Sequence, residues 1–264
     1  MTELDFQILD DILSLADPDS SRELCSVALV GLGPALELLL QNPNTVRSIV
    51  ESAQPSPTII AINNLFRNTP QLVTGDILPC EIVRTPPTIE DVDQPVWNSF
   101  LIRAQRASEA SGAPKNLAQA LIGTLQEMSE NVVWHSCAAN TGLAGYRWTE
   151  GIFEYFVGDL GIGVLKSLRQ NLLYTYLDNS IDALHLALNN GVSRFPLDAN
   201  RGTGFNSLLR NIAKNCCDLR FHTSDAVIVY EGIASFMNST PIKVKDATAP
   251  NLSGFTISLH CKIK

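Results

Sequence analysis

The sequence predicts a protein of the α/β class, more specifically α+β, and three observations lead to this expectation. Hydrophobic residues make up 45% of the 264 residues, a share that supports a packed core and excludes intrinsic disorder as the main description. Stretches with apolar residues at helical spacing are separated by short β-branched and aromatic stretches. Pro and Gly gather between them, where turns are expected. A chain of this length forms one large or two modest domains.

The N-terminal part predicts a small module of helices and strands. Leu4 and Ile8 recur at helical spacing behind Thr2, which can cap a first helix. A long apolar stretch follows at residues 24–40, and the β-branched run at residues 58–62 indicates a strand. The role of this module is not readable from its residues.

A proline-rich segment separates this module from the rest of the chain. Five prolines lie between residues 68 and 95, with only short extended pieces among them. We therefore expect an N-terminal module at residues 1–94 and a second domain at residues 95–264. In the second domain the pattern predicts helices at 96–110 and 113–136, a strand at 153–157, helices at 181–190 and 207–215, and strands at 226–230 and 255–263.

Charge and cysteine content narrow the class of function. Lys and Arg number 19 against 27 Asp and Glu, so the net charge is −8, which argues against binding to a nucleic-acid backbone. The six cysteines include no C-x-x-C pair, which fits reduced thiols and argues against a zinc site. No basic secretory signal begins the chain, and Gly31, Pro34 and Glu37 interrupt the apolar stretch too often for a membrane helix. We therefore expect a cytoplasmic protein that does not enter a membrane.

Glu127, Asn131 and His135 form the first candidate site. They lie four residues apart on the predicted helix at 113–136, so they follow one stripe of its surface. A neighbouring apolar stripe would face the core, and it consists of Leu117, Leu121, Leu125, Met128 and Val132. A polar stripe beside a buried one is typical of a helix that lines a cleft. The alternative is a solvated helix face with an incidental Asn.

A turn at residues 159–163 forms the second candidate site. Its sequence, Asp-Leu-Gly-Ile-Gly, directly follows the predicted strand. Gly161 and Gly163 permit a sharp turn and the close approach of a ligand. Asp159, at the end of the strand, can accept hydrogen bonds from an amino group. The alternative is an ordinary turn from a strand to a helix.

A second glycine-containing turn forms the third candidate site. Arg201 is followed by Gly202, Thr203 and Gly204, just before the predicted helix at 207–215. Backbone N–H groups at such a helix start, together with the helix dipole, favour a phosphate group. A loop that simply leads into a helix would look similar.

Taken in this order, the three sites resemble the motifs of the GHKL ATPase superfamily. This is the ATP-binding fold of histidine kinases, DNA gyrase B, MutL, ninety-kilodalton heat-shock chaperones and anti-sigma serine kinases. The helical triplet is similar to the N box, the turn at 159–163 to the D-x-G-x-G box, and residues 202–204 to the second glycine box. The resemblance covers residues 95–264. It implies a two-layer sandwich of the Bergerat type, in which a mixed, mostly antiparallel sheet carries helices on one face.

The resemblance also implies what the polar side chains do. Asn131 would bind the Mg²⁺ that bridges the phosphates of ATP. Glu127 would orient or deprotonate the attacking water or hydroxyl. Asp159 would accept a hydrogen bond from the adenine amino group. His135 would belong to the same nucleotide site.

The same resemblance assigns the glycines to the two ends of ATP. Gly161 and Gly163 would shape the adenine side. Gly202 and Gly204, on either side of Thr203, would cradle the phosphates with backbone amides. A mobile lid over the nucleotide lies between the two glycine boxes in the family. Arg201 and Arg194 would be able to reach the phosphates when this lid closes.

Two features depart from the family pattern. The closing strand usually begins Gly-Thr, with the Thr hydroxyl near adenine, whereas here Phe255 stands between Gly254 and Thr256. Thr256 would therefore make this contact from a position displaced by one residue. The segment between the glycine boxes is long and contains the predicted helix at 181–190, for which residues 178–180 offer cap candidates.

The missing family features limit the kind of protein that we expect. Residues 1–95 contain no histidine, so an autonomous histidine kinase is not expected. The resemblance points instead to the bacterial regulatory and anti-sigma branch, in which ATP is hydrolysed or its phosphoryl group passes to a protein partner; a homodimer is compatible with this. In the alternative, ATP only closes a lid at residues 164–201 and switches a partner surface. A third hypothesis treats the motifs as structural relics of an α/β protein.

Overall fold

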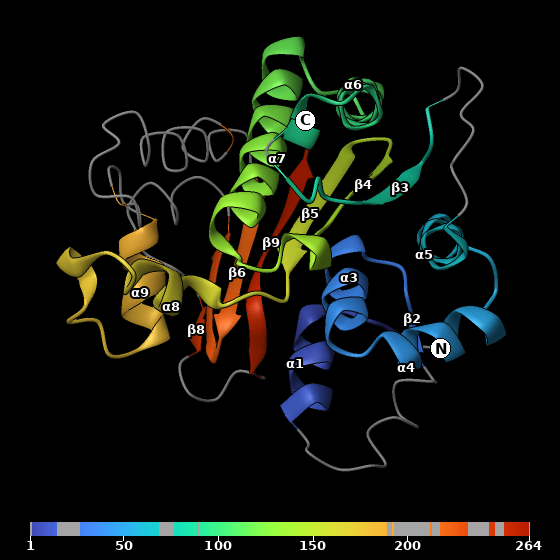
Figure 1. Cartoon of the computed structure of the whole chain (residues 1–264). Helices are drawn as coiled ribbons and strands as arrows, with labels where there is room; N and C mark the ends of the chain where they lie inside the picture. Colours follow the sequence, from blue (N-terminus) through green and yellow to red (C-terminus); the bar gives the residue numbers. More distant parts are fainter. Residues whose placement is uncertain are drawn as a thin grey trace.

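A seven-stranded antiparallel sheet lies at the centre of the computed structural model (Figure 1). The structure describes residues 2–14, 27–68, 77–88, 90–188, 192, 212, 217–231, 243–245 and 251–263. In spatial order the strands are β3 (Cys80–Arg84), β4 (Leu143–Thr149), β5 (Ile152–Asp159), β9 (Leu252–Lys262), β6 (Cys217–Ser224), β7 (Ala226–Glu231) and β8 (Lys243–Lys245). Each described neighbour pair in this sheet is antiparallel. The parallel pairing joins β1 (Thr2–Glu3) to β2 (Val27–Ala28) in a separate small sheet.

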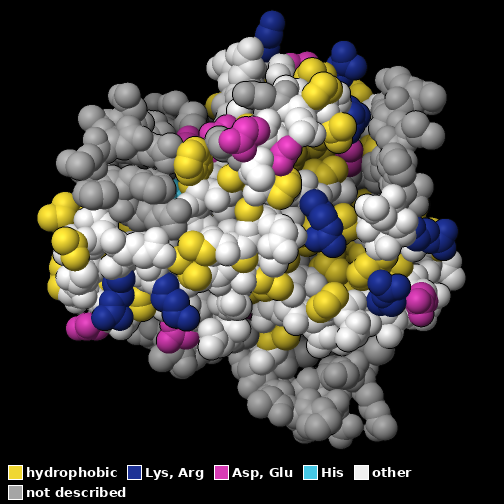
Figure 2. Space-filling view, viewed as in Figure 1, with side chains coloured by type: hydrophobic (Ala, Val, Ile, Leu, Met, Phe, Trp, Pro, Cys, Tyr) yellow, Lys and Arg dark blue, Asp and Glu magenta, His cyan; other side chains and the backbone are white. Residues whose placement is uncertain are grey.

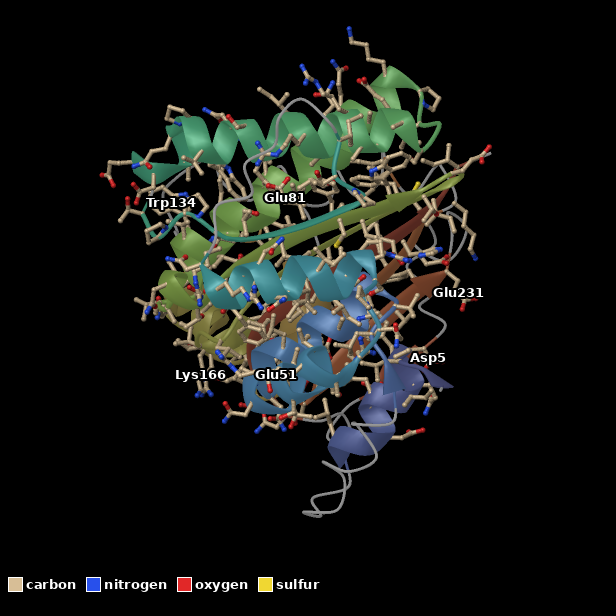
Figure 3. The ribbon with its side chains drawn as sticks, turned by 90° about the vertical axis from the view of Figure 1, so that its right-hand side faces the viewer. Asp5, Glu51, Glu81, Trp134, Lys166 and Glu231 are labelled. Atoms are coloured by element: carbon tan, nitrogen blue, oxygen red, sulfur yellow. The ribbon has the colours of Figure 1, made fainter. Side chains whose placement is uncertain are left out.

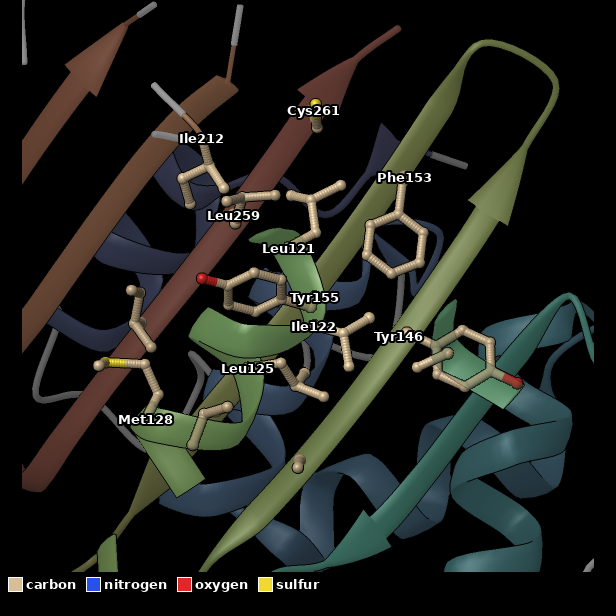
Figure 4. Close-up of a cluster of buried hydrophobic side chains, with 14 of the residues drawn as sticks. Leu121, Ile122, Leu125, Met128, Tyr146, Phe153, Tyr155, Ile212, Leu259 and Cys261 are labelled. Atoms are coloured by element: carbon tan, nitrogen blue, oxygen red, sulfur yellow. The ribbon is translucent and has the colours of Figure 1, made fainter. Parts of the chain in front are cut away.

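One face of the sheet is covered by helices that follow the sheet's first strand. They are α6 (Pro95–Ala110), α7 (Lys115–His135), α8 (Gly163–Leu168) and α9 (Ser180–Ala187). The larger hydrophobic core lies beneath α7, where Leu121, Leu125 and Met128 pack against alternate residues of the strands, such as Tyr155 and Leu259 (Figure 4). The apolar stripe expected on this helix is therefore confirmed, and it fixes α7 on the sheet with its polar stripe beside the core.

The N-terminal helices cover the other face of the sheet. They are α1 (Phe6–Ser14), α3 (Leu32–Gln41), α4 (Pro43–Ser52) and α5 (Pro57–Arg67). Their apolar residues form a second core with Ile82, Leu143 and Phe156 of the sheet. The side view shows the sheet between the green helices above and the blue and cyan helices below (Figure 3). Strand β5 is accordingly buried along nearly all of its length.

The predicted fold class is confirmed as α+β, and one expectation about its layers needs correction. Helices α6, α7 and α9 share one core, as a two-layer sandwich requires. The N-terminal helices, however, cover the second face, so helices lie on both faces of the sheet instead of on one. The sheet itself is antiparallel in its described pairings instead of mixed. Strand β3 joins the sheet although it precedes the expected boundary at residue 95, and this division of the chain remains a prediction.

Two local expectations in the N-terminal part were wrong. Thr2 lies in strand β1, and the first helix starts at Phe6, where the Asp5 carboxylate accepts a hydrogen bond from the Ile8 N–H at 2.8 Å. The β-branched run at residues 58–62 lies in helix α5, because Ser56 caps this helix and Pro57 occupies its first turn. Burial of its apolar face outweighs the β propensity of the run.

The expected helices and strands of the second domain agree closely with the structure. The helices predicted at 96–110, 113–136 and 181–190 correspond to α6, α7 and α9. Asn179, one of the predicted cap candidates, caps α9 by accepting from the Asp182 N–H at 2.8 Å. The strands predicted at 153–157, 226–230 and 255–263 correspond to β5, β7 and β9. Of the helix predicted at 207–215, the structure describes only residue 212.

Candidate functional site

Helix α7 carries Glu127, Asn131 and His135 on a partly buried surface. Burial raises the pKa of the Glu127 carboxyl to about 7, and the negative charge of Glu130 adds to the effect. Glu130 itself accepts a hydrogen bond from the side-chain amide of Gln126 at 2.9 Å. On the face of the molecule that carries α7, acidic side chains lie beside hydrophobic ones (Figure 2). Glu127 can therefore exchange a proton near neutral pH, which a general base requires.

Asp159 lies buried at the end of strand β5. Burial raises the pKa of its carboxyl to about 7, although the Gly161 N–H, which donates to Oδ1 at 2.7 Å, favours the ionised form. The side chain lies on the α7 face, since alternate residues of β5, including Val157, belong to the core beneath α7. A carboxyl in such a position can accept a hydrogen bond from an amino group without competition from bulk water.

The turn after β5 packs directly against the end of α7. The Ile162 N–H donates to the Ser136 carbonyl at 2.8 Å. A Cβ on Gly161 would lie 2.1 Å from the same carbonyl oxygen, so only glycine fits there. Gly163 has a φ of +73°, a conformation that L side chains rarely adopt. The structure thus brings the turn of the second candidate site against Ser136, the residue that follows His135 of the first.

Thr223 of strand β6 is a member of this region that the sequence did not reveal. Its hydroxyl donates to the Gly254 carbonyl at 2.8 Å and accepts from the Val164 N–H at 3.1 Å. Thr223 pairs in register with Phe255, which pairs in turn with Asp159. The period-two alternation of β6, with Leu219 and Phe221 in the core beneath α7, is the signal that would have placed Thr223 on this face.

Thr256 does not join the site. Its side chain is buried on the opposite face of the sheet, where its hydroxyl donates to the Glu37 carboxylate at 3.2 Å. Neighbouring residues of a strand point to opposite faces, so the insertion of Phe255 after Gly254 turns the Thr hydroxyl away from the face that carries Asp159. The expected contact of Thr256 with adenine is therefore not made by this side chain.

The third candidate site falls outside the described residues. This applies to Arg201, Gly202, Thr203 and Gly204, and also to Arg194. Their predicted roles toward phosphate groups remain predictions.

A small cavity adjoins the turn after β5. It has a volume of about 210 Å³. Its lining consists of Gly161, Ile162, Lys166, Ser224, Asn251, Leu252, Ser253 and Gly254. Gly161 is the predicted site residue in this lining, and Lys166 supplies a positive charge. The cavity could thus receive part of a ligand that carries a negative charge.

The described residues contain no group of three or more His, Cys, Asp or Glu side chains that could hold a metal ion. A Mg²⁺ ion held by one Asn oxygen would not need such a group, since waters and phosphate oxygens usually complete its coordination. Asn131 of α7 is the residue to which the resemblance assigns this function.

Comparison with known proteins gives no family for this sequence. No protein-family model matches it, and no curated protein matches it at a significant level. Among the described helices, none is long and apolar enough to cross a membrane.

Proposed function

We propose that this chain binds Mg²⁺-ATP in a site of the GHKL type and hydrolyses the nucleotide or passes its phosphoryl group to a protein partner. One observation carries the proposal. The end of the helix with Glu127 and Asn131 contacts the turn that follows Asp159, through Ser136, on the same face of the sheet. This contact between segments distant in the sequence supports the proposal.

The residues present fit ATP at the adenine end. The buried Asp159 carboxyl has one described hydrogen-bond donor, the Gly161 N–H. An adenine amino group would offset part of the cost of burying this carboxyl by donating a second hydrogen bond. Gly161 allows the turn beside Asp159 to pack closely against the Ser136 carbonyl.

The chemistry would depend on α7. Asn131 would hold Mg²⁺, which supplies positive charge that stabilises the phosphates of the bound nucleotide. Glu127 would accept the proton of the attacking water or hydroxyl, and a carboxyl pKa of about 7 suits this role near neutral pH. His135 lies one turn further along the same helix and would complete the polar stripe.

Calorimetric titration of ATP into the full chain, with and without Mg²⁺, tests the binding. We expect binding that requires Mg²⁺ and that Asn131→Ala weakens by about tenfold or more, roughly the loss of one charge-assisted contact. Asn116→Ala is a matched control, since Asn116 lies exposed on the same helix, and it should leave the affinity unchanged. No binding at millimolar ATP would contradict the proposal.

Analysis of the reaction products then distinguishes a protein that turns over ATP from one that only binds it. Glu127→Ala should keep ATP binding and lose the formation of ADP or of a phosphorylated partner. Wild-type protein that binds Mg²⁺-ATP but releases no product would favour the alternative, in which the nucleotide is only a ligand that changes a partner surface.

A further inference from the structure

A cluster of four buried charged side chains joins the N-terminal helices to the sheet. Asp10 of α1 and Glu37 of α3 lie opposite Arg220 and His222 of β6, and none of the four is more than 4% exposed. Arg220 Nη2 donates to Asp10 Oδ1 at 2.6 Å and to Glu37 Oε1 at 3.2 Å. The ring of Phe6 lies 4.4 Å from the Arg220 guanidinium carbon. The cluster lies on the sheet face away from α7, and none of its four residues has a predicted role.

The hydrogen bonds of the cluster determine its charges. Although burial opposes ionisation, Arg220 and His222 lower the pKa of Glu37 to about 2, so this side chain is a carboxylate at neutral pH. His222 Nδ1 lies 2.6 Å from Glu37 Oε1, and Nε2 lies 3.2 Å from the Ser224 carbonyl oxygen. Arg220 thus supplies positive charge beside the buried Glu37 carboxylate, and His222 joins Glu37 to the backbone of Ser224.

The same segment of β6 forms a wall of the candidate site on the other face. Thr223, between His222 and Ser224, holds the Gly254 carbonyl and the Val164 N–H. The register of β6 with β9 shifts between Thr223 and Ser224, and Ser224 has a φ of +51°. Such a shift leaves backbone groups without their regular ladder partners. The bond from His222 to the Ser224 carbonyl secures the strand at this point, and Ser224 and Gly254 both line the cavity beside Gly161.

We propose that this charged cluster makes the N-terminal helices a supporting part of the nucleotide site. In this arrangement Glu37 and His222 are positioning residues: they hold the end of β6, which in turn holds the turn at residues 161–164 and the start of β9. When α1 and α3 are packed on the sheet, the affinity for nucleotide is then higher. Bound nucleotide in turn strengthens this packing, because a coupling between two sites is reciprocal. A protein partner that draws α1 away from Arg220 would lower the nucleotide affinity. The coupling to nucleotide rests on the proposed function, whereas the stabilisation of the turn at residues 161–164 and of the start of β9 does not.

Hydrogen exchange of the full chain without nucleotide tests whether the charged cluster stabilises the segments that β6 holds, residues 160–166 and 252–256. In Glu37→Gln we expect amide exchange in residues 160–166 and 252–256 to be faster by about tenfold or more, the change expected when a buried hydrogen-bond partner is lost. Glu81→Gln is the matched control. Glu81 is buried, with 2% exposed, and is paired with Arg103 at 2.6 Å, but on the edge strand β3. It should speed exchange around β3 and α6 and leave residues 160–166 unchanged.

A milder variant covers the case in which Glu37→Gln does not fold. Thr256→Val removes only the hydroxyl that donates to Glu37 Oε2. It should speed exchange in residues 160–166 and 252–256 in the same way by a smaller factor. Unchanged exchange at residues 160–166 in every variant of the cluster that folds would overturn the proposal, whether or not ATP binds.

The reciprocal measurement uses Mg²⁺-ATP. In the wild type, saturating nucleotide should slow exchange in residues 6–14 of α1, and in Glu37→Gln this effect should disappear while ATP affinity falls several-fold. Glu81→Gln should keep both the affinity and the protection of α1. Binding of ATP without any change in α1 would overturn the coupling. Exchange in residues 160–166 and 252–256 could become faster in Glu37→Gln while the wild type binds no ATP. This result would reject the proposed function but would still show that the cluster stabilises these segments.

Discussion

The imidazole of His222 lies 2.6 Å from the Glu37 carboxylate, although 185 positions separate the two residues. The contact joins helix α3 on one face of the sheet to the strand whose other face borders the candidate site. It explains why a charged residue, Glu37, stands in the middle of the most apolar stretch of the N-terminal part. Without Arg220 and His222, burial of this carboxylate would cost several kcal/mol.

The stability of the fold at acid pH should depend on Glu37. The pKa of its carboxyl is about 2 in the folded state and 4.5 in the ordinary reference state. The ionised group therefore contributes stability above a pH of about 4.5, and this contribution is lost as the pH falls toward about 2. Glu37→Gln should be less stable than the wild type at pH 7, by about 3–5 kcal/mol, and should lose less stability on acidification. Urea unfolding at pH 2, 3.5, 5 and 7 measures both effects, since these values cover the range between the two pKa values and the plateau above it.

Glu51→Gln serves as the control for this experiment. Glu51 lies exposed on α4, so the variant should follow the wild-type curve. Equal pH dependence in Glu37→Gln and in the wild type would show that Glu37 does not carry this part of the acid transition.

Ionisation of Asp159 should lower the stability of the fold, whereas ionisation of Glu37 raises it. Burial raises the pKa of its carboxyl from 3.8 to about 7. Such a group favours the folded state most at a pH below about 3.8, and its contribution is lost as the pH rises through about 7. Asp159→Asn keeps an oxygen that can accept from the Gly161 N–H and removes the titration. Its melting temperature relative to the wild type should therefore rise between pH 5 and pH 8, as measured by differential scanning calorimetry. A difference that stays constant over this range would contradict a raised pKa at Asp159.

The pH dependence of any ATP turnover should follow Glu127. If this carboxylate is the base, the turnover rate should rise with pH through a midpoint of about 7. Glu130→Gln removes a negative neighbour, so it should lower the pKa of Glu127 and shift the midpoint to lower pH. Glu127→Gln should reduce turnover by about 10²–10⁴-fold, as expected for loss of a general base. A midpoint that does not move in Glu130→Gln would count against Glu127 as the titrating group.

Gly254 should tolerate alanine poorly, and Gly112 offers a matched comparison. The two residues have nearly equal φ angles, +101° at Gly254 and +102° at Gly112. A Cβ on Gly112 would meet Ile263 at 3.7 Å, whereas one on Gly254 would lie 2.1 Å from the Asp159 carbonyl oxygen. Gly112→Ala should therefore cost the backbone strain alone, about 1–3 kcal/mol, and Gly254→Ala clearly more. Urea unfolding of both variants measures the difference, and similar losses would mean that the turn near Asp159 can relax.

Local periodicity determined which segments became helices and strands in the second domain. The stripe of α7 from Leu117 to Val132 shows this best, since its period places five residues on one face regardless of what the helix packs against. The candidate motifs on this helix and in the turn at residues 159–163 were likewise visible in the sequence. These features depend on residues close to one another in the chain, so a single sequence contains them.

The tertiary structure decided what lies on each face of the sheet. Strand β5 is buried on both faces, so its sequence does not say that N-terminal helices cover one of them. Whether Thr256 faces the site or Glu37 depends on its register beside β5 and β6. Glu37 similarly looked like an interruption of an apolar stretch until Arg220 and His222 were found beside it. The sequence by itself thus determined the elements and the candidate motifs, while long-range packing decided which side chains meet, because burial of a charge is stable only where distant partners compensate it.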